Sequence, residues 1–254
     1  MLTERILEKD RTAILTARQM GPAASAELTP LLKNADPEVR EIAVYCLDET
    51  GGPAALQAMA SALSDENPQV RGAALQGLQH RADRASYDAL LAAYDRSQDA
   101  YTRQQVMLIL GRIAGANDVG DLKRRCVDEK EPTTQEGCVV SLALLNDDAA
   151  QKEFIRRLQA SKQQERARYL DYSQLIHAAW LVKPLAPILD DKTPMVRVGV
   201  DARPDLIQDL RACDLALNLI VAISRRTFSF PVNRATNYSD AQIAEVRSFA
   251  QRQP

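Results

Sequence analysis

The sequence predicts an all-α fold, an α-solenoid in which about six helix pairs stack on one another and a further helix caps the C-terminal end. The first observation is an internal repeat, because the stretch from Asp36 to Leu47 recurs at an offset of 31 residues as the stretch from Asn67 to Leu78. Self-similarity at a fixed period of this length is typical of repeat arrays. The second is composition: aromatic residues make up only 5% of the chain, which favours helix-on-helix packing over a sheet.

The chain begins with a predicted cap and two regular helix pairs. Residues 2–20 predict one helix ended by Gly21, so residues 1–21 are expected to cover the N-terminal end of the array. Repeat units follow over residues 22–224. In the first two units a proline opens the first helix, a turn with a second proline follows, and a Val-Arg pair begins the second helix. The matching residues are Pro22 and Pro53, Pro37 and Pro68, Val39 and Val70, Arg40 and Arg71, Ala43 and Ala74, and Leu47 and Leu78.

The later units follow the same plan with decreasing regularity. The third turns at residues 99–103, and the fourth turns at residues 131–135, where Gln135 replaces the arginine. In the fifth unit a basic, polar stretch near Arg166 and Arg168 comes before the second helix, which is predicted to run through Leu175, Ala178, Ala179 and Val182. The sixth unit contains a long connection over residues 190–206, with a strand-like middle from Met195 to Val200, followed by a helix over residues 206–224. Residues 225–254 are predicted to cross over and end in a capping helix that begins with a Ser239–Gln242 capping box. The whole chain is thus expected to be one solenoid domain.

Composition and charge restrict the class of protein. The net charge is -2, so nothing in the balance calls for a polyanionic partner. The N-terminal residues lack the basic and apolar segments of a signal peptide, and no apolar segment approaches the length that crosses a bilayer. Four scattered cysteines without a Cys-x-x-Cys pair predict reduced, buried thiols in a cytoplasmic protein: Cys46, Cys126, Cys138 and Cys213.

The paired helices, the Asp-Pro-x-Val-Arg turn and the Ala-Ala-x-x-x-Leu second helix resemble HEAT repeats. The short period is most similar to the HEAT-like repeats of phycobilisome lyases. The resemblance covers residues 22–143 closely and residues 144–224 more loosely. In HEAT proteins the turn aspartate and the following arginine build a ladder of hydrogen bonds between successive units. The resemblance implies that role for Asp36, Arg40, Arg71, Asp99 and Arg103.

The resemblance also implies that the second helices line a groove. Counted from the arginine of the Val-Arg pair, apolar residues recur at positions +2, +3, +4 and +7, so positions +1, +5 and +8 are predicted to face outward. Aromatic and aliphatic residues there would anchor a protein partner, and carboxylates would form a rim. The predicted partner-binding residues are Glu41, Tyr45, Asp48, Gln76, Leu108, Glu136, Val140, Ile176, Trp180 and Asp214. Trp180 has an alternative interpretation as a core residue.

The predicted function is that of a non-enzymatic, monomeric protein–protein interaction module that needs no cofactor or metal. A small, slightly acidic array also fits a bacterial immunity protein that neutralises a toxin by binding it. The enzymatic alternatives are a bilin lyase and a DNA alkylpurine glycosylase. Trp180 and Asp214 resemble the aromatic and carboxylate residues of the glycosylase, but the groove line is net acidic with Lys183 as its cation, which argues against nucleic acid.

The sequence contains few residues or motifs typical of an active site. The two histidines are His80, expected at a solvated helix end, and His177, expected in the core. No metalloprotease, nucleophile-elbow, phosphate-loop or dinucleotide motif is present in the sequence. We therefore predict no catalytic residues.

Overall fold

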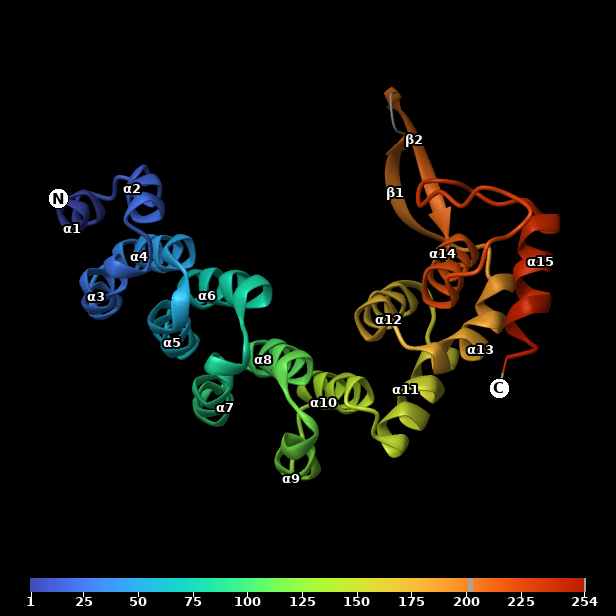
Figure 1. Ribbon diagram of the computed structural model, residues 1–254, viewed down its shortest axis with the longest axis horizontal. Helices are drawn as coiled ribbons and strands as arrows, with labels where there is room; N and C mark the ends of the chain where they lie inside the picture. The colour runs from blue at the N-terminus through green and yellow to red at the C-terminus, as the bar shows by residue number, and fades with distance from the viewer. Residues whose placement is uncertain (201–202, 254) are drawn as a thin grey trace. The chain divides into compact units, whose positions relative to one another are not determined.

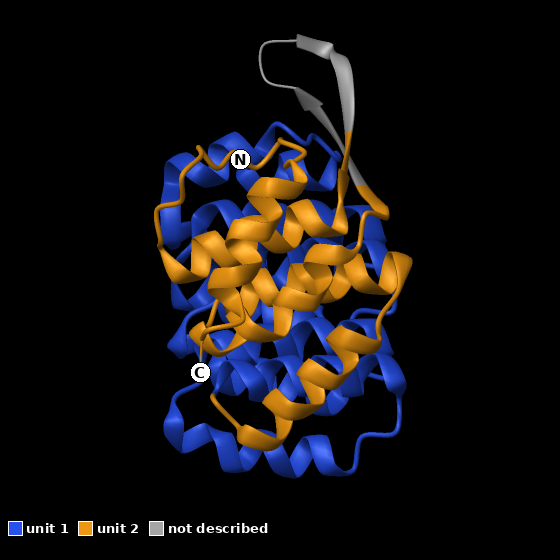
Figure 2. Cartoon of the chain, turned by 90° about the vertical axis from the view of Figure 1, so that its right-hand side faces the viewer, with its two compact units in different colours: residues 1–145 blue, residues 146–254 orange. Residues whose placement is uncertain are grey.

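The computed structural model describes residues 1–200 and 203–253. This part of the chain consists mainly of stacked helices and divides into two compact units, Met1–Leu145 and Asn146–Pro254 (Figures 1 and 2). The predicted helical solenoid is confirmed. The single domain over residues 1–254 stays a prediction.

Unit 1 contains the regular repeats. Each pair combines a shorter first helix, often opened by a 3₁₀ turn, with a longer second helix. Its elements are α1 (Leu2–Leu7), α2 (Ala13–Met20), η1 (Gly21–Ala24), α3 (Ser25–Leu28), η2 (Thr29–Lys33), α4 (Pro37–Thr50), α5 (Gly52–Ala62), α6 (Pro68–Arg81), η3 (Arg84–Ser86), α7 (Tyr87–Arg96), α8 (Ala100–Ile113), η4 (Ala116–Asp118), α9 (Val119–Val127) and α10 (Pro132–Leu144).

Unit 2 is less regular and includes an antiparallel β-hairpin. Its elements are α11 (Asp148–Ala160), α12 (Gln163–Ile176), η5 (Ala179–Leu181), α13 (Val182–Leu185), η6 (Ala186–Asp190), β1 (Pro194–Val200), β2 (Arg203–Arg211), α14 (Ala212–Ser224) and α15 (Asp240–Ala250).

The second helices of unit 1 form for the reasons that the repeat predicts. Asp36 and Asn67 cap α4 and α6 by accepting hydrogen bonds from the N–H groups of Glu38 and Gln69, both at 2.9 Å. A proline follows each cap at the first helical position, where its missing N–H costs nothing. One face of each helix is buried, and the leucine at position +7 is fully enclosed in three successive copies, namely Leu47, Leu78 and Leu110.

An arginine ladder joins successive turns, as the resemblance implies. Arg40 pairs with Asp65 in the next turn, and Arg71 lies 3.8 Å from Asp99. The next rung joins Arg103 to Glu129. Each of these arginines spans two helix pairs, so the charges are structural. In the fourth turn Gln135 donates instead to the carbonyl of Glu129 at 2.8 Å.

A further rung occurs in unit 2, where the sequence did not predict it. Arg166, in the first turn of α12, donates to Asp191 at 2.6 Å and to the carbonyl of Ser161. Arg166 therefore occupies the ladder position of the fifth unit. Counting helix positions from Arg166 therefore gives α12 a different register from the predicted one, and this changes which of its residues are expected to face outward.

Several predicted boundaries were wrong. The N-terminal cap is two helices rather than one. The strand-like character predicted for the middle of the 190–206 connection is confirmed, since that stretch forms β1. The helix predicted from residue 206 begins at Ala212, because the residues before it form β2. In the fifth unit α12 ends at Ile176, and His177 adopts a left-handed conformation (φ 46°, ψ 43°) that stops the helix.

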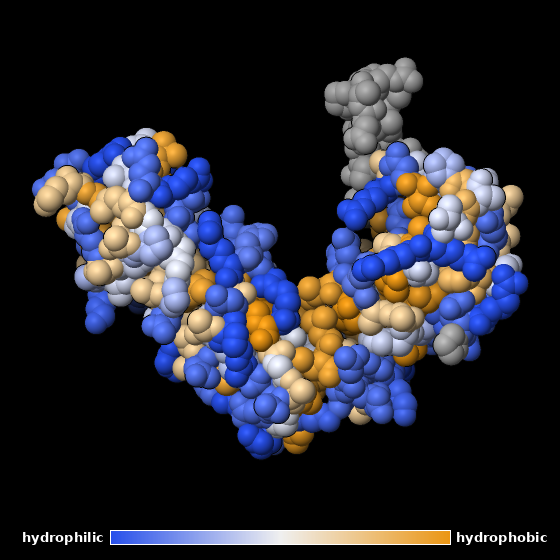
Figure 3. Space-filling view, viewed as in Figure 1, coloured by the Kyte–Doolittle hydropathy of each residue, from blue (hydrophilic) through white to orange (hydrophobic). Residues whose placement is uncertain are grey.

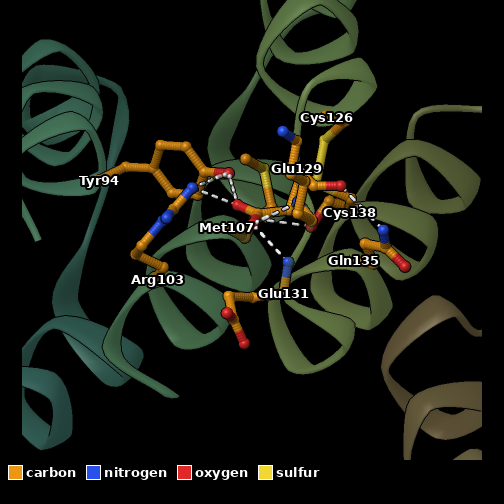
Figure 4. The surroundings of a disulfide bond; sticks show 10 residues. Tyr94, Arg103, Met107, Cys126, Glu129, Glu131, Gln135 and Cys138 are labelled. Atoms are coloured by element: carbon orange, nitrogen blue, oxygen red, sulfur yellow. Dashed lines mark hydrogen bonds and ion pairs between the residues drawn. A yellow bond between two sulfur atoms is a disulfide. The ribbon is translucent and has the colours of Figure 1, made fainter. Parts of the chain in front are cut away.

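One pair of cysteines contradicts the prediction of four reduced thiols. Cys126 at the end of α9 and Cys138 in α10 form a disulfide, with their Cα atoms 5.7 Å apart (Figure 4). The two cysteines are 12 residues apart in the sequence, a spacing that matches no recognisable cysteine motif. Cys46 and Cys213 are free and buried, and burial raises the pKa of the Cys46 thiol to about 12.

The disulfide closes the turn that carries the ladder acid Glu129. The Glu129 carboxylate accepts hydrogen bonds from the Tyr94 hydroxyl at 3.0 Å and from the N–H groups of Lys130 and Glu131, both at 2.9 Å. Arg103 approaches the same carboxylate (Figure 4). This buried acid is therefore well compensated, and its turn is held at both ends.

Candidate functional site

The predicted groove positions of unit 1 fall into two groups. Tyr45 and Leu108 are half-buried and Gln76 is exposed, so these three side chains remain accessible. Glu41 and Asp48 are half-buried but engaged within the chain: Arg11 lies 3.4 Å from Glu41, and Arg81 lies 2.5 Å from Asp48. These two carboxylates are therefore already paired and do not form a free acidic rim.

Glu136 and Val140 do not face outward as predicted, since Glu136 is 7% exposed and Val140 is fully buried. The cause is the close approach of α10 to α8. A Cβ added at Gly111 of α8 would lie 2.6 Å from the Cβ of Ser141 in α10. At this short distance the neighbouring helix covers positions +1 and +5, and Glu136 accepts a hydrogen bond from Gln104 at 3.0 Å.

Ile176 and Trp180 were assigned from the wrong helical register. Ile176 is the buried last residue of α12, and Trp180 lies in the 3₁₀ turn η5. The Trp180 ring packs edge-on against Phe154, with centroids 6.1 Å apart, and Phe154 contacts Tyr169 in the same way at 5.6 Å. Trp180 is half-buried, so its ring is partly packed against Phe154 and is not the freely exposed anchor that the predicted register placed there.

Asp214 is fully buried, and it stabilises the start of α14. Its carboxylate accepts hydrogen bonds from the N–H and guanidinium of Arg211 at 2.8–3.0 Å and from the N–H of Tyr238 at 2.9 Å. Burial opposes ionisation, but the hydrogen bonds from Arg211 and Tyr238 dominate and lower the pKa of Asp214. Asp214 is a structural residue and cannot contact a partner directly.

The corrected register identifies different residues on α12. Counted from Arg166, position +5 is Asp171 and position +8 is Gln174, and both are exposed. They face a cleft of about 160 Å³ between α12 and α14 within unit 2. Its walls are Leu170, Asp171, Gln174 and His177 from α12 and its end, Leu215, Asn218, Leu219 and Ala222 from α14, and Arg234 from the crossover.

The cleft combines an aliphatic lining with uncommitted polar groups. Leu170 and Leu219 are buried and Leu215 is half-buried, so together they form an apolar floor. Among the described residues, Asp171 and Arg234 have no hydrogen-bonding or ionic partner for their side chains. Partial burial raises the pKa of Asp171, because no cation in the described part of the chain compensates its charge. Figure 3 shows hydrophobic residues beside hydrophilic ones on the viewed face of unit 2.

A hydrogen-bonded clamp positions the crossover that supplies Arg234. The Tyr238 hydroxyl donates to Asn218 Oδ1 of α14 or to the carbonyl of Asn233, both at 2.8 Å, and accepts from the N–H of Asn233 at 3.0 Å. The N–H of Tyr238 is held by Asp214. Asn233, the residue before Arg234, is therefore linked to α14 through the Tyr238 hydroxyl.

The described residues offer little for histidine or metal chemistry. His177, predicted in the core, is exposed at the rim of the cleft. Across residues 1–200 and 203–253, no group of three or more His, Cys, Asp or Glu side chains could hold a metal ion. No helix in the described part of the chain combines the length and apolar character needed to cross a membrane.

Comparison with known proteins identifies the class. The sequence matches HEAT repeats over residues 8–79 and 57–143, which together span more than half of the chain, so the chain belongs to the HEAT-repeat family. A similar solved structure is the complex of CpcE and CpcF of phycocyanin lyase from Nostoc sp. PCC7120, at 13% sequence identity and a TM-score of 0.51. The match covers 98% of this chain and 93% of that one, and at this identity it shows a shared fold. A search of the curated proteins finds no match.

Proposed function

We propose that this HEAT-repeat chain is a protein-binding module whose main anchor site is the cleft between α12 and α14. The observation that carries the proposal is the cleft itself, an aliphatic floor with unpaired Asp171 and Arg234 at its edges. Small-molecule sites usually have volumes of about 300–1,000 Å³. The cleft, at about 160 Å³, fits one inserted side chain of a protein better than a larger ligand.

The similar structure supports a protein partner, since it is a complex of two proteins. Tyr45, Gln76 and Leu108 stay predicted contacts on unit 1 and form a separate candidate surface. A monomeric state, a cytoplasmic location and the lack of a nucleic-acid partner likewise stay predictions.

Affinity capture with a matched pair of variants tests this proposal. Leu215→Gln introduces a polar side chain into the cleft, whereas Leu175→Gln makes the same change at an exposed position of α12 outside the cleft. We expect one protein from the source cell to bind the wild type and the Leu175 variant but not the Leu215 variant. Circular dichroism should confirm that both variants fold. Capture that is equal for both variants would show that the cleft is not the binding site.

A chromophore lyase is the second candidate, favoured by the similarity to a phycocyanin lyase complex. Incubation of the chain with an open-chain tetrapyrrole should then produce a shifted visible absorption band, and addition of a phycocyanin subunit should yield a covalently coloured product. The small volume of the α12–α14 cleft favours protein binding over this role at that site.

A further inference from the structure

We infer that the α12–α14 cleft binds a partner segment in which one aliphatic side chain is flanked by a basic residue facing Asp171 and an acidic residue facing Arg234. The inference rests on the proposed function, because it specifies which partner the same cleft accepts. It follows from how charges are distributed in unit 2.

Several acidic side chains of unit 2 already have a cationic partner within the chain. Glu153 pairs with Arg156 and Arg157, at 2.7 and 2.6 Å, and Asp191 pairs with Arg166. Further pairs are Asp190 with Arg247, Asp240 with Lys192, and Asp214 with Arg211. Asp171 differs from all of these, since it lies in a cleft and lacks a cation among the described residues.

The unpaired charge on Asp171 favours a cationic group on the partner. Partial desolvation destabilises its carboxylate, and an incoming ammonium or guanidinium would offset that cost. Glu165 provides the comparison. It is an exposed acid on the same helix, outside the cleft, and no cation pairs with its side chain among the described residues. Charge at Glu165 should therefore matter little for a segment in the cleft.

Arg234 gives the cleft a second, opposite charge. The backbone around it is fixed, because the N–H of Ala235 donates to Asn233 Oδ1 at 3.0 Å and Asn233 contacts Tyr238. No ion pair within the described residues joins Arg234 to Asp171. Both charges thus stay available, and a segment with a cation and an anion on either side of an aliphatic residue satisfies both at once.

Labelled synthetic peptides provide the test. The probes carry Lys-Leu-Glu, Glu-Leu-Lys, Glu-Leu-Glu, Lys-Leu-Lys or Lys-Ser-Glu at their centre, with identical glycine flanks, and binding is measured by fluorescence anisotropy at low and high salt. We expect one of the two mixed-charge leucine peptides to bind about tenfold more tightly than the others. Asp171→Lys should abolish this preference, whereas Glu165→Lys should preserve it. Equal binding of all peptides, or no binding of any, would overturn the inference.

Two further outcomes separate the inference from the proposed function. If Asp171→Lys still captures the cellular protein that Leu215→Gln loses, the proposed function is supported, and the inference that Asp171 binds a basic residue of the partner is wrong. If free leucine competes as well as the best peptide, the cleft recognises a small zwitterion, and the assignment to a protein segment is wrong. Failure of the wild type to bind any protein in a variant-dependent manner would instead remove the proposed function itself.

Discussion

Arg40 holds Asp65 in a bidentate ion pair, with Nε to Oδ2 and Nη2 to Oδ1 distances that are both 2.8 Å. Only 7% of the Arg40 side chain and 10% of the Asp65 side chain are exposed. The pair joins α4 to the turn that precedes α6, so it ties one repeat to the next. Removal of one partner would leave the other charge buried and uncompensated.

The first prediction concerns this rung. Arg40→Ala should lower the free energy of unfolding by about 3–5 kcal/mol, as expected when a buried ion pair loses one member. Arg96→Ala, at an exposed arginine without an ion pair among the described residues, should change it by less than about 0.5 kcal/mol. Urea denaturation measures both. Similar midpoints for the two variants would show that the ladder contributes little to stability.

The second prediction concerns pH. Although burial opposes ionisation, hydrogen bonds from Arg40 and from the N–H of Asn67 lower the pKa of Asp65, and hydrogen bonds from Thr193 together with Arg166 lower that of Asp191. A lowered folded-state pKa stabilises the fold above the unfolded aspartate pKa of about 3.9, and this contribution is lost as the pH falls through the folded-state pKa. The melting temperature should therefore drop steeply below about pH 4–5. In Arg40→Ala the melting temperature should fall less steeply with decreasing pH than in the wild type. Equal slopes for the two proteins would show that Asp65 does not contribute to the loss of stability in acid.

The third prediction concerns the disulfide. Closure of a 12-residue separation by Cys126 and Cys138 should stabilise the chain by about 3 kcal/mol. Intact mass after alkylation in denaturant should show two modified cysteines without reduction and four with it. The Cys126→Ser variant should melt at a lower temperature than the oxidised wild type. Four modified cysteines without reduction, in protein prepared without reductant, would restore the prediction of four reduced thiols.

The fourth prediction compares two glycines in second helices. Gly111→Ala should destabilise the fold by about 1–3 kcal/mol, because the new Cβ would overlap the backbone of Ser141 at 2.7 Å. Gly72→Ala meets nothing within 4 Å and should stabilise α6 by up to about 1 kcal/mol. Thermal melts of both variants check the pair. A gain in stability for Gly111→Ala would mean that α8 and α10 are packed less closely than described.

The repeat framework could be predicted because its signals are local. Val70, Arg71 and Leu78 match their counterparts 31 residues earlier, and a match of this kind specifies both the turn and the buried face. The resemblance supplied the ladder arginines and Asp99, but not the acids Asp65 and Glu129, and Asp36 pairs with Lys9 instead. What local spacing does not show is how closely two helices approach, and this is why Glu136 and Val140 were wrongly expected to face outward.

The candidate site on unit 2 was missed because of one register error. The rule of positions +5 and +8 selects Asp171 and Gln174 once Arg166 is taken as position zero. The signal was present, because Arg166 follows a turn at Ser161 much as Arg40 follows a turn at Asn34. The basic, polar stretch around Arg166 instead suggested a connection, and the helix was extended past His177. Arg234 could not be predicted from the helical spacing, since it enters the cleft from the separate crossover segment.

The dissociation constant of the captured partner for the wild type, Leu215→Gln and Leu175→Gln, measured by calorimetry, tests the central claim most directly. We expect the Leu215 variant to bind at least about tenfold more weakly, equivalent to about 1.4 kcal/mol, with the Leu175 variant indistinguishable from the wild type. Equal dissociation constants for all three proteins would contradict the account.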